Sequence, residues 1–204
     1  MKDAGGKLAA SAAILAGGEA RRFGSNKALA DVDGRPIIAH VAEALAAAFE
    51  ELLLIANVAE PYAFLGLKTS PDDRPGLGPL GGIATALRAS RFPWTFVVAC
   101  DMPAVDPSVA SGIARLAIDG DADAVAPHVD GRWHPLFACY HRRLLPKIEE
   151  RLDANRLSVH SLLDGIRVRR VDETEFTALG GTRHTLWNVN RPEDLDGSAS
   201  RNID

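Results

Sequence analysis

The chain has 204 residues, of which 47% are hydrophobic and 25% charged, and its formal net charge is −4. This length suits one domain with a full hydrophobic core, and the slight acidity disfavours nucleic acid or an anionic membrane surface as a partner. No stretch approaches the roughly 20 apolar residues of a membrane span. Cys100 and Cys139 both lie in apolar runs. We therefore expect a cytoplasmic protein with two buried, unpaired thiols.

Apolar runs alternate with helix-like segments through the first part of the chain. Strands are predicted at 12–16, 51–56, 94–100 and 122–126, and helices at 36–49, 79–89 and 107–118. Each of these helices begins at a proline, and Ile37, Val41 and Leu45 recur at the spacing of one helical face. Fully apolar strands separated by helices indicate a parallel sheet covered on both faces.

The second part of the chain changes in style. Strands are predicted at 133–140, 166–171 and 185–189, helices at 141–152 and 159–163, and a frayed polar end at 197–204. We expect these elements to complete a mixed sheet within one domain, residues 1–204. The predicted fold class is α/β, a Rossmann-like three-layer α/β/α arrangement with a mostly parallel central sheet.

A glycine-rich segment follows the first predicted strand. Gly17 and Gly18 can take positive φ angles and approach a ligand closely, and successive N–H groups in such a loop bind anions. Arg22 and Lys27 add two cations, and Gly24 lets the chain turn between them. This combination indicates a site for a nucleoside triphosphate. It is not a Walker A loop, because no Gly-Lys-Ser/Thr follows.

The same segment carries a family resemblance. Its sequence, Leu15-Ala-Gly-Gly-Glu-Ala-Arg-Arg-Phe-Gly-Ser-Asn-Lys27, resembles the Leu-Ala-Gly-Gly-x-x-x-Arg-x-Gly-x-x-Lys signature of sugar-nucleotide and cofactor nucleotidyltransferases. Within that group the chain is most similar to the molybdenum cofactor guanylyltransferases, which make molybdopterin guanine dinucleotide. The resemblance spans about residues 12–195. Phe23 stands where Met is usual, and Asn26 stands where Asp commonly precedes the lysine.

The resemblance implies a nucleotide site in about residues 8–127. Gly78-Pro-Leu-Gly-Gly82 matches the family's loop beneath the guanine ring, and Asn57 matches an amide that helps to hold the base. An aspartate shortly upstream of the loop reads the base, and spacing favours Asp72 over Asp73. The implied nucleotide contacts are Leu15, Ala16, Gly17, Gly18, Lys27, Asn57, Asp72, Gly78, Pro79 and Leu80. The Gly-x-Gly-x-x-Gly pattern at 76–81 follows no central strand, so it does not indicate a dinucleotide oxidoreductase.

A carboxylate at the end of the strongest predicted strand indicates a metal site. Asp101 ends an apolar run, and Cys-Asp-Met-Pro at 100–103 matches the family's Cys-Asp-x-Pro. Mg²⁺ prefers one or two carboxylates together with substrate phosphates. Trp187-Asn-Val-Asn190 resembles the family's Asn-Val-Asn motif, which implies Asn190 as a second ligand. Alternation along the predicted strand 185–189 would place Asn188 and Asn190 on one face.

The resemblance also implies an acceptor half at about residues 128–195. His134, Arg132, Arg156, Asn188 and Asn190 are the implied contacts to a pterin that carries a terminal phosphate. The expected activity is GMP transfer from GTP to molybdopterin, with Arg22, Lys27 and Asp101 as catalytic residues and Mg²⁺ as cofactor. Other cofactor-biosynthesis proteins or molybdoenzyme chaperones are the expected protein partners. The alternatives are a cytidylyltransferase, a guanylyltransferase for another phosphorylated molecule, or a nucleotide-binding regulator without turnover.

Overall fold

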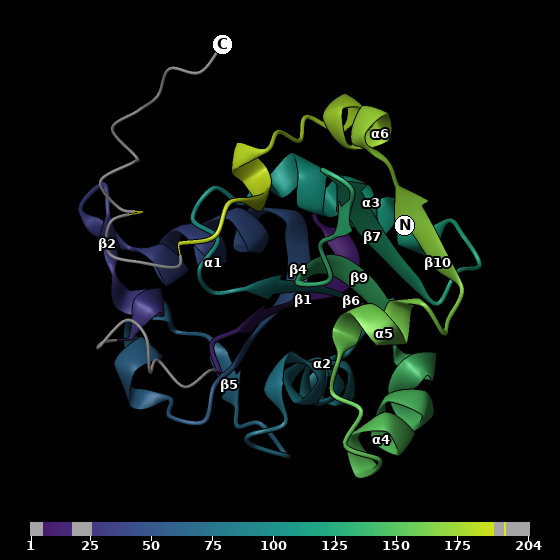
Figure 1. Ribbon diagram of the computed structural model, residues 1–204. Helices are drawn as coiled ribbons and strands as arrows, with labels where there is room; N and C mark the ends of the chain where they lie inside the picture. Colours follow the sequence, from purple (N-terminus) through teal and green to yellow (C-terminus); the bar gives the residue numbers. More distant parts are fainter. Residues whose placement is uncertain (1–5, 18–25, 190–193, 195–204) are drawn as a thin grey trace.

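The computed structural model describes residues 6–17, 26–189 and 194 (Figure 1). Its strands are β1 (Leu8–Leu15), β2 (Asp31–Val32), β3 (Arg35–Pro36), β4 (Phe49–Ile55), β5 (Lys68–Ser70), β6 (Trp94–Ala99), β7 (Ala124–Val129), β8 (Arg132–Trp133), β9 (Phe137–His141) and β10 (Val168–Val171). The α-helices are α1 (Ile37–Ala48), α2 (Gly78–Ala89), α3 (Pro107–Ile118), α4 (Leu145–Asp153), α5 (Val159–Leu163) and α6 (Glu173–Ala178). Four 3-10 turns join the described elements: η1 (Lys27–Leu29), η2 (Glu60–Leu65), η3 (Arg142–Leu144) and η4 (His184–Leu186).

Within the described residues, one large sheet organises the molecule. Its strands follow the order β10-β7-β9-β6-β1-β4-β5, with β8 paired to β7. β1 pairs in parallel with both β4 and β6, and β5 extends the parallel group. β9 runs antiparallel to β6 and to β7. The predicted mixed, mostly parallel sheet is therefore confirmed.

Helices cover both faces of this sheet and bury its apolar side chains. The face beneath α1, α3 and α6 holds most of the buried aromatic groups, and Phe96 packs against Phe49 and Phe137 with ring centroids 5.6 and 5.1 Å apart. The opposite face packs against α2, α4 and α5 (Figure 1). The strands β1 and β6 are buried on both faces, which explains why their sequences show no polar alternation. The predicted three-layer α/β/α class is confirmed.

Several predicted boundaries are accurate, and others need correction. α3 and α5 match their predicted ranges, and the remaining helices and strands of the first part lie close to theirs. The predicted strand 133–140 is two strands, β8 and β9, because Pro135 and its neighbours form the bend between them. The predicted helix 141–152 begins as the 3-10 turn η3, because His141 belongs to β9. The hairpin β2–β3, the edge strand β5 and the helix α6 are not predicted by the sequence pattern.

The predicted strand 185–189 is wrong. Residues His184–Leu186 form η4, and the chain continues to Val189 without regular structure. Asn190 lies outside the described residues, as do Gly18, Arg22, Gly24 and the whole polar end 197–204. Among the described residues, no helix combines the length and the apolar character needed to cross a membrane.

Candidate active site

Four parallel strands end side by side at one edge of the sheet, here named the carboxyl edge. Because β5, β4, β1 and β6 are neighbours in that order and run in one direction, the residues that follow them also lie in that order. Gly17 follows β1, Asn57 follows β4, Asp72 follows β5 and Asp101 follows β6. Three strand spacings, roughly 14 Å, separate β5 from β6. The predicted nucleotide residues are therefore distributed along one edge, where open α/β sheets bind ligands.

Lys27 begins the 3-10 turn η1, which is anchored through Asn26 to the segment that follows β4. Asn26 caps η1, since its Oδ1 accepts a hydrogen bond from the Ala28 N–H at 3.2 Å. The Nδ2 of Asn26 donates to the Tyr62 hydroxyl at 2.8 Å. Tyr62 is buried in η2, the segment that follows β4. The turn that begins at Lys27 is thus tied to the chain that leaves the neighbouring strand.

The charges of Lys27 and Asp101 both affect the pKa of the Cys100 thiol. Burial, and after it the Asp101 carboxylate, raises the pKa of Cys100 to about 12, while the positive charge of Lys27 acts in the opposite direction. The Cys100 N–H donates to the Leu15 carbonyl at 3.2 Å, which joins the ends of β6 and β1. The predicted cation and the predicted metal carboxylate therefore lie at the same part of the edge.

Asp101 is held by the C-terminal segment. Its Oδ1 accepts a hydrogen bond from Asn188 Nδ2 at 2.8 Å, and its main-chain carbonyl accepts from the Val189 N–H at 2.9 Å. Within the described residues, its Oδ2 accepts no hydrogen bond. Asn188 reaches Asp101 from an irregular segment, so the strand alternation predicted for Asn188 and Asn190 is not the reason for its position.

The base side of the edge is organised around Asp72. The Asp72 N–H donates to Asn57 Oδ1 at 3.0 Å, which links the ends of β5 and β4. The Asp72 carboxylate accepts through Oδ1 from the Arg74 N–H at 3.0 Å and from Thr85 Oγ1 at 3.2 Å. Because Asn57 uses its oxygen internally, its Nδ2 is the group that can donate to a base.

Asp73 faces a different environment. Its carboxylate pairs with Arg88 of α2, and Arg88 also bonds Glu149 of α4 at 2.7 Å. The Asp73 side chain is 46% exposed. The Asp73 carboxylate therefore takes part in a surface ion-pair network, whereas the Asp72 carboxylate is bonded to Thr85 and to the Arg74 N–H.

The Gly78–Gly82 motif forms the first turns of α2 rather than a loop. Gly78 has φ +66°, a left-handed value that suits glycine, and Pro79 lies at the start of the helix. Leu80 is fully buried in the core, so its side chain cannot contact a nucleotide. A Cβ on Gly82 would lie 3.3 Å from Leu15 Cδ1, so glycine lets α2 pack closely on the end of β1.

Gly17 departs from its predicted geometry. Its φ does not lie in the left-handed region, and a Cβ placed on it would meet no atom within 4 Å among the described residues. Leu15 is buried, Ala16 is partly buried and Gly17 is exposed. The backbone of Gly17 therefore does not require glycine. The missing side chain instead keeps the space at the end of β1 open.

The predicted acceptor residues are dispersed. His134 lies just before β9, where burial lowers its pKa and Arg132 lowers it further, while its hydrogen bond to the Val129 carbonyl has the opposite effect. A neutral imidazole favours hydrogen bonding over a charged contact with phosphate. Arg156 is exposed beyond α4 and pairs with Glu150 at 2.8 Å. The structure thus brings His134 and Arg132 to the carboxyl edge beside β7 and β9, and gives Arg156 a surface ion pair.

Three residues with clear roles in this arrangement are absent from the sequence-based predictions: Tyr62, Thr85 and Arg74. Each acts through a contact distant in sequence, with Tyr62 bonded to Asn26, Thr85 to Asp72, and Arg74 to Asp153 at 2.7 Å. One sequence signal was available for Thr85, a lone polar residue within the apolar run of α2. No comparable pattern marks Tyr62 or Arg74.

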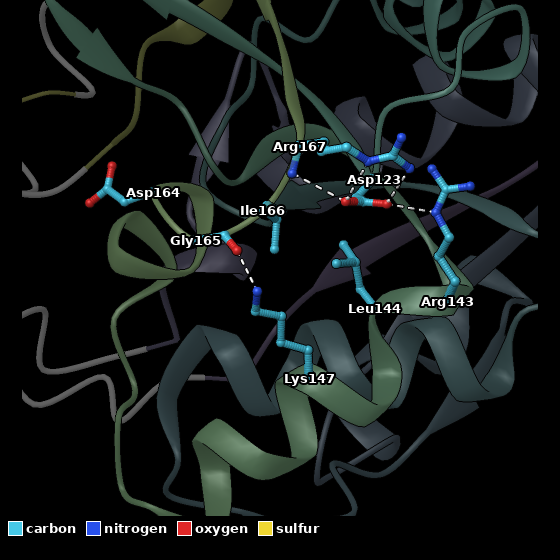
Figure 2. Close-up of a pocket in the computed structure, with 8 residues that line it drawn as sticks. All are labelled: Asp123, Arg143, Leu144, Lys147, Asp164, Gly165, Ile166 and Arg167. Atoms are coloured by element: carbon cyan, nitrogen blue, oxygen red, sulfur yellow. Dashed lines mark hydrogen bonds and ion pairs between the residues drawn. The ribbon is translucent and has the colours of Figure 1, made fainter.

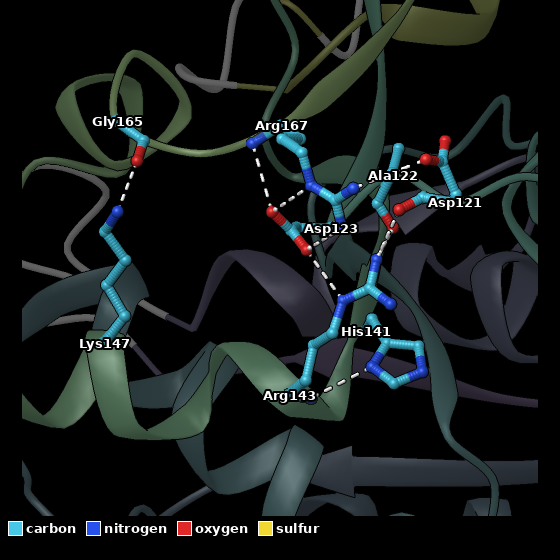
Figure 3. Close-up of polar contacts among 8 residues, drawn as sticks. All are labelled: Asp121, Ala122, Asp123, His141, Arg143, Lys147, Gly165 and Arg167. Carbon is cyan, nitrogen blue, oxygen red and sulfur yellow. Dashed lines mark hydrogen bonds and ion pairs between the residues drawn. The ribbon is translucent and has the colours of Figure 1, made fainter.

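A pocket of about 540 Å³ lies at the opposite edge of the sheet, where β7 and β10 begin (Figure 2). Its lining is Asp123, Arg143, Leu144, Lys147, Asp164, Gly165, Ile166 and Arg167. Asp123 accepts from Arg143 Nε at 2.7 Å and from the Arg167 N–H at 3.1 Å, and Lys147 donates to the Gly165 carbonyl (Figure 3). None of the predicted site residues lines it. The contacts connect three chain segments, which indicates a structural role.

The doubly covered, mostly parallel sheet, with charged and amide side chains along its carboxyl edge, defines an α/β protein of the nucleotide-binding class. Comparison with known sequences identifies it more closely. The chain belongs to the MobA-like NTP transferase domain family, whose profile matches residues 12–171. It is therefore a nucleotidyltransferase, and the family resemblance predicted from the motifs is confirmed.

Relatives resemble the chain over nearly its whole length. A protein of Pelotomaculum thermopropionicum named probable molybdenum cofactor guanylyltransferase is 38% identical over 190 residues, which are 92% of this chain and 91% of that protein. A protein of Deinococcus radiodurans with the same name is 39% identical, over 92% of this chain and 93% of that protein.

Solved structures share the fold. Molybdopterin-guanine dinucleotide biosynthesis protein A from Archaeoglobus fulgidus has a TM-score of 0.81 at 24% identity, covering 93% of this chain and 97% of that one. CMP:2-keto-3-deoxy-manno-octonic acid synthetase, solved with CTP, has a TM-score of 0.72 at 14% identity, covering 95% of this chain and 98% of that one. At these identities the likeness establishes the fold alone.

Proposed function

We propose that this enzyme transfers GMP from GTP to the terminal phosphate of molybdopterin or the molybdenum cofactor, releases pyrophosphate and forms the guanine dinucleotide. The observation that carries the proposal is the order of groups along the carboxyl edge. Asn57 and Asp72 lie at β4 and β5, Lys27 and Asp101 lie near the ends of β1 and β6, and His134 lies beyond them next to β9. This order matches a base, its phosphates and an acceptor lying side by side.

The nucleotide half, about residues 8–127, would fix the base and the triphosphate. Asn57 Nδ2 and the Asp72 carboxylate supply a donor and an acceptor for guanine. Lys27, and Arg22 from the glycine-rich segment, supply positive charge to the phosphates. Positioning and charge neutralisation are the main requirements of phosphoryl-type transfer.

The reaction itself needs one bond made and one bond broken. An oxygen of the acceptor's terminal phosphate attacks the α-phosphorus of GTP, and the bond from that phosphorus to the oxygen bridging the α- and β-phosphates breaks. The electron pair leaves with pyrophosphate, whose charge Lys27 and Arg22 stabilise. Because a phosphate nucleophile is already ionised near neutral pH, the residues of the acceptor half, about 128–195, need to orient it rather than deprotonate it.

Asp101 fits a magnesium ligand. Asn188 fixes one carboxylate oxygen at 2.8 Å, and the other accepts no hydrogen bond within the described ranges, so it is available to a hard cation. No three His, Cys, Asp or Glu side chains of the described residues gather into a metal cage. Such an ion would therefore rely on substrate phosphates and water for its other ligands, as Mg²⁺ commonly does. When bound, it would neutralise charge on the phosphates.

The deciding experiment measures pyrophosphate release with each nucleoside triphosphate and with molybdopterin or its molybdenum-bound form as acceptor. GTP with either acceptor should support turnover, and the product should be the guanine dinucleotide. Faster turnover with CTP than with GTP would identify a cytidylyltransferase instead. Tight GTP binding without pyrophosphate release, with either acceptor, would indicate a regulator or a guanylyltransferase for another phosphorylated molecule.

The cellular setting follows from the same proposal. Cys100 and Cys139 are both free thiols, which suits a reducing cytoplasm. The product is a cofactor that must reach its enzyme, so cofactor-biosynthesis proteins or molybdoenzyme chaperones are the proposed protein partners. Co-purification of such a protein with the product-loaded enzyme, but not with the empty enzyme, would support that partnership.

A further inference from the structure

The buried hydroxyl of Thr85 contacts the loop that contains Asp72 and Asp73. Thr85 is 2% exposed and lies in the middle of α2, among the apolar residues Ile83, Ala84, Ala86 and Leu87. A helical threonine commonly bonds a main-chain carbonyl of the preceding turn. Here Thr85 Oγ1 donates instead to Asp72 Oδ1 at 3.2 Å and accepts from the Asp73 N–H at 3.1 Å.

These contacts leave the two oxygens of Asp72 unequal. Oδ1 accepts two hydrogen bonds, one from Thr85 and one from the Arg74 N–H at 3.0 Å, which occupy both of its lone pairs. Oδ2 accepts none from the described residues. It lies beside the first turn of α2, 3.4 Å from the position that a Cβ on Gly81 would occupy. Oδ2 is therefore the oxygen of Asp72 that can accept from a ligand.

The orientation of this carboxylate depends on Thr85. The torsion that turns the carboxyl group of an aspartate is broad, so a carboxylate without partners samples many orientations. The main chain of Asp72 is fixed by Asn57 at 3.0 Å, which leaves the side-chain torsion to Thr85 and the Arg74 N–H. Arg74 is itself fixed by its ion pair with Asp153, at 2.7 Å.

We propose that Thr85 is a positioning residue for base selection, which holds Asp72 so that Oδ2 faces the guanine N1–H and 2-amino group. The inference rests on the proposed function, in which Asp72 reads the base. A purine without the 2-amino group offers one donor fewer to this oxygen. Thr85 thereby acts on the choice between nucleotides through Asp72, without touching the nucleotide itself.

The test compares GTP with ITP, which lacks the 2-amino group, in Thr85→Val, Thr85→Ser and the parent enzyme. Valine keeps the shape of threonine and removes the hydroxyl. We expect the ratio of kcat/KM for GTP to that for ITP to fall about tenfold in Thr85→Val, mainly through KM for GTP, with kcat within about twofold. Thr85→Ser retains the hydroxyl and should keep the parent ratio. The ratio is insensitive to the fraction of folded enzyme, because both nucleotides are measured on one sample.

A second variant and a control keep the test independent of folding defects at Thr85. Asp72→Asn keeps the shape of the side chain but replaces the accepting carboxylate with an amide, so it should also lower the GTP preference. Arg88→Ala removes the partner of the Asp73 carboxylate and should leave the ratio unchanged. A parent-like ratio in Thr85→Val, together with its loss in Asp72→Ala, would overturn the role of Thr85 alone. A parent enzyme that does not distinguish GTP from ITP would contradict base reading by Asp72, whereas a parent enzyme without turnover on GTP would contradict the proposed function.

Discussion

Asp101 is the residue whose chemistry can be separated most cleanly from its structural contacts. Asp101→Asn preserves the side-chain shape and the oxygen that accepts from Asn188, so the 2.8 Å contact and the fold should survive. A neutral amide is a poor ligand for Mg²⁺, so turnover should fall by about a hundredfold or more. The rate should recover in part as magnesium is raised. Rate against magnesium concentration, with thermal unfolding alongside, checks this.

A capping role for Asp101 gives a different outcome. Asparagine caps a turn about as well as aspartate, so stability, rate and magnesium dependence would then all match the parent enzyme. That result would exclude Asp101 as a metal ligand, and the proposed mechanism would lose much of its support.

Lys27 should matter through its charge. Lys27→Ala removes the positive charge that would contact the triphosphate. Because a charge-assisted contact is worth about 1.5–3 kcal/mol, the smallest expected loss of kcat/KM is roughly tenfold to a hundredfold. Lys68→Ala, at an exposed lysine of the edge strand β5, is a matched control and should leave the rate unchanged. Steady-state kinetics of both variants make the comparison. Activity of Lys27→Ala within twofold of the parent would exclude Lys27 from the site.

At the scale of elements, the Asn26–Tyr62 contact joins η1 to η2. Burial raises the pKa of Tyr62, so its hydroxyl stays protonated. Tyr62→Phe removes one partner of the 2.8 Å bond and should cost about 0.5–1.5 kcal/mol of unfolding free energy. It should also raise KM for GTP by about two- to tenfold, because Lys27 begins the anchored turn. Denaturant unfolding and GTP kinetics measure the two effects.

A double-mutant cycle separates the contact from its surroundings. If Asn26 and Tyr62 act through one another, Tyr62→Phe combined with Asn26→Ala should cost less than the sum of the single variants. Asn26→Asp, which introduces the residue more common in the family, should retain the contact because a tyrosine hydroxyl can donate to a carboxylate. Additive losses would show that η1 and η2 are held by other contacts.

At the scale of the whole molecule, the polar groups at the two edges of the sheet differ in how completely they are paired. The carboxyl edge holds groups with unused donors or acceptors, whereas the opposite edge holds the ion-pair cluster around Asp123. Burial raises the pKa of the Asp123 carboxyl, but hydrogen bonds from Arg167 and Arg143 outweigh it and leave that pKa below its ordinary value. The cluster fixes the start of β10 against β7 and η3 (Figure 3).

Removing this carboxylate should affect stability and leave catalysis intact. Asp123→Ala should lower the unfolding free energy by about 1–3 kcal/mol at pH 7 without changing kcat. Because the folded pKa is depressed, the stabilisation is complete above the unfolded value of about 3.9 and is lost as pH falls through the folded pKa. The difference in stability between parent and variant should therefore shrink between pH 7 and pH 3. Urea unfolding at both pH values measures it, and a difference that grows at low pH would contradict the assignment.

The local features of this protein are determined by the sequence alone. Proline-initiated helices, doubly apolar strands and the glycine-rich, Cys-Asp-x-Pro and Gly-Pro-Leu motifs are each encoded within a few residues, since backbone preferences and side-chain periodicity are short-range properties. These were sufficient for the α/β class, for Lys27 and Asp101 as site candidates, and for the family. The local motifs do not determine the position of Asn188, because the strand that the sequence predicts at 185–189 does not form.

The tertiary structure decided what depends on distant contacts. It inserted β9 antiparallel between β6 and β7, and so placed His134 at the carboxyl edge. It gave Asp72 and Asp73 different partners, because Thr85 and Arg88 lie 13 and 15 residues away from them along the chain. It joined Asn26 to Tyr62 across 36 residues, and Asp101 to Asn188 across 87. Such pairings follow from which segments the sheet brings together, and no local preference of the chain encodes them.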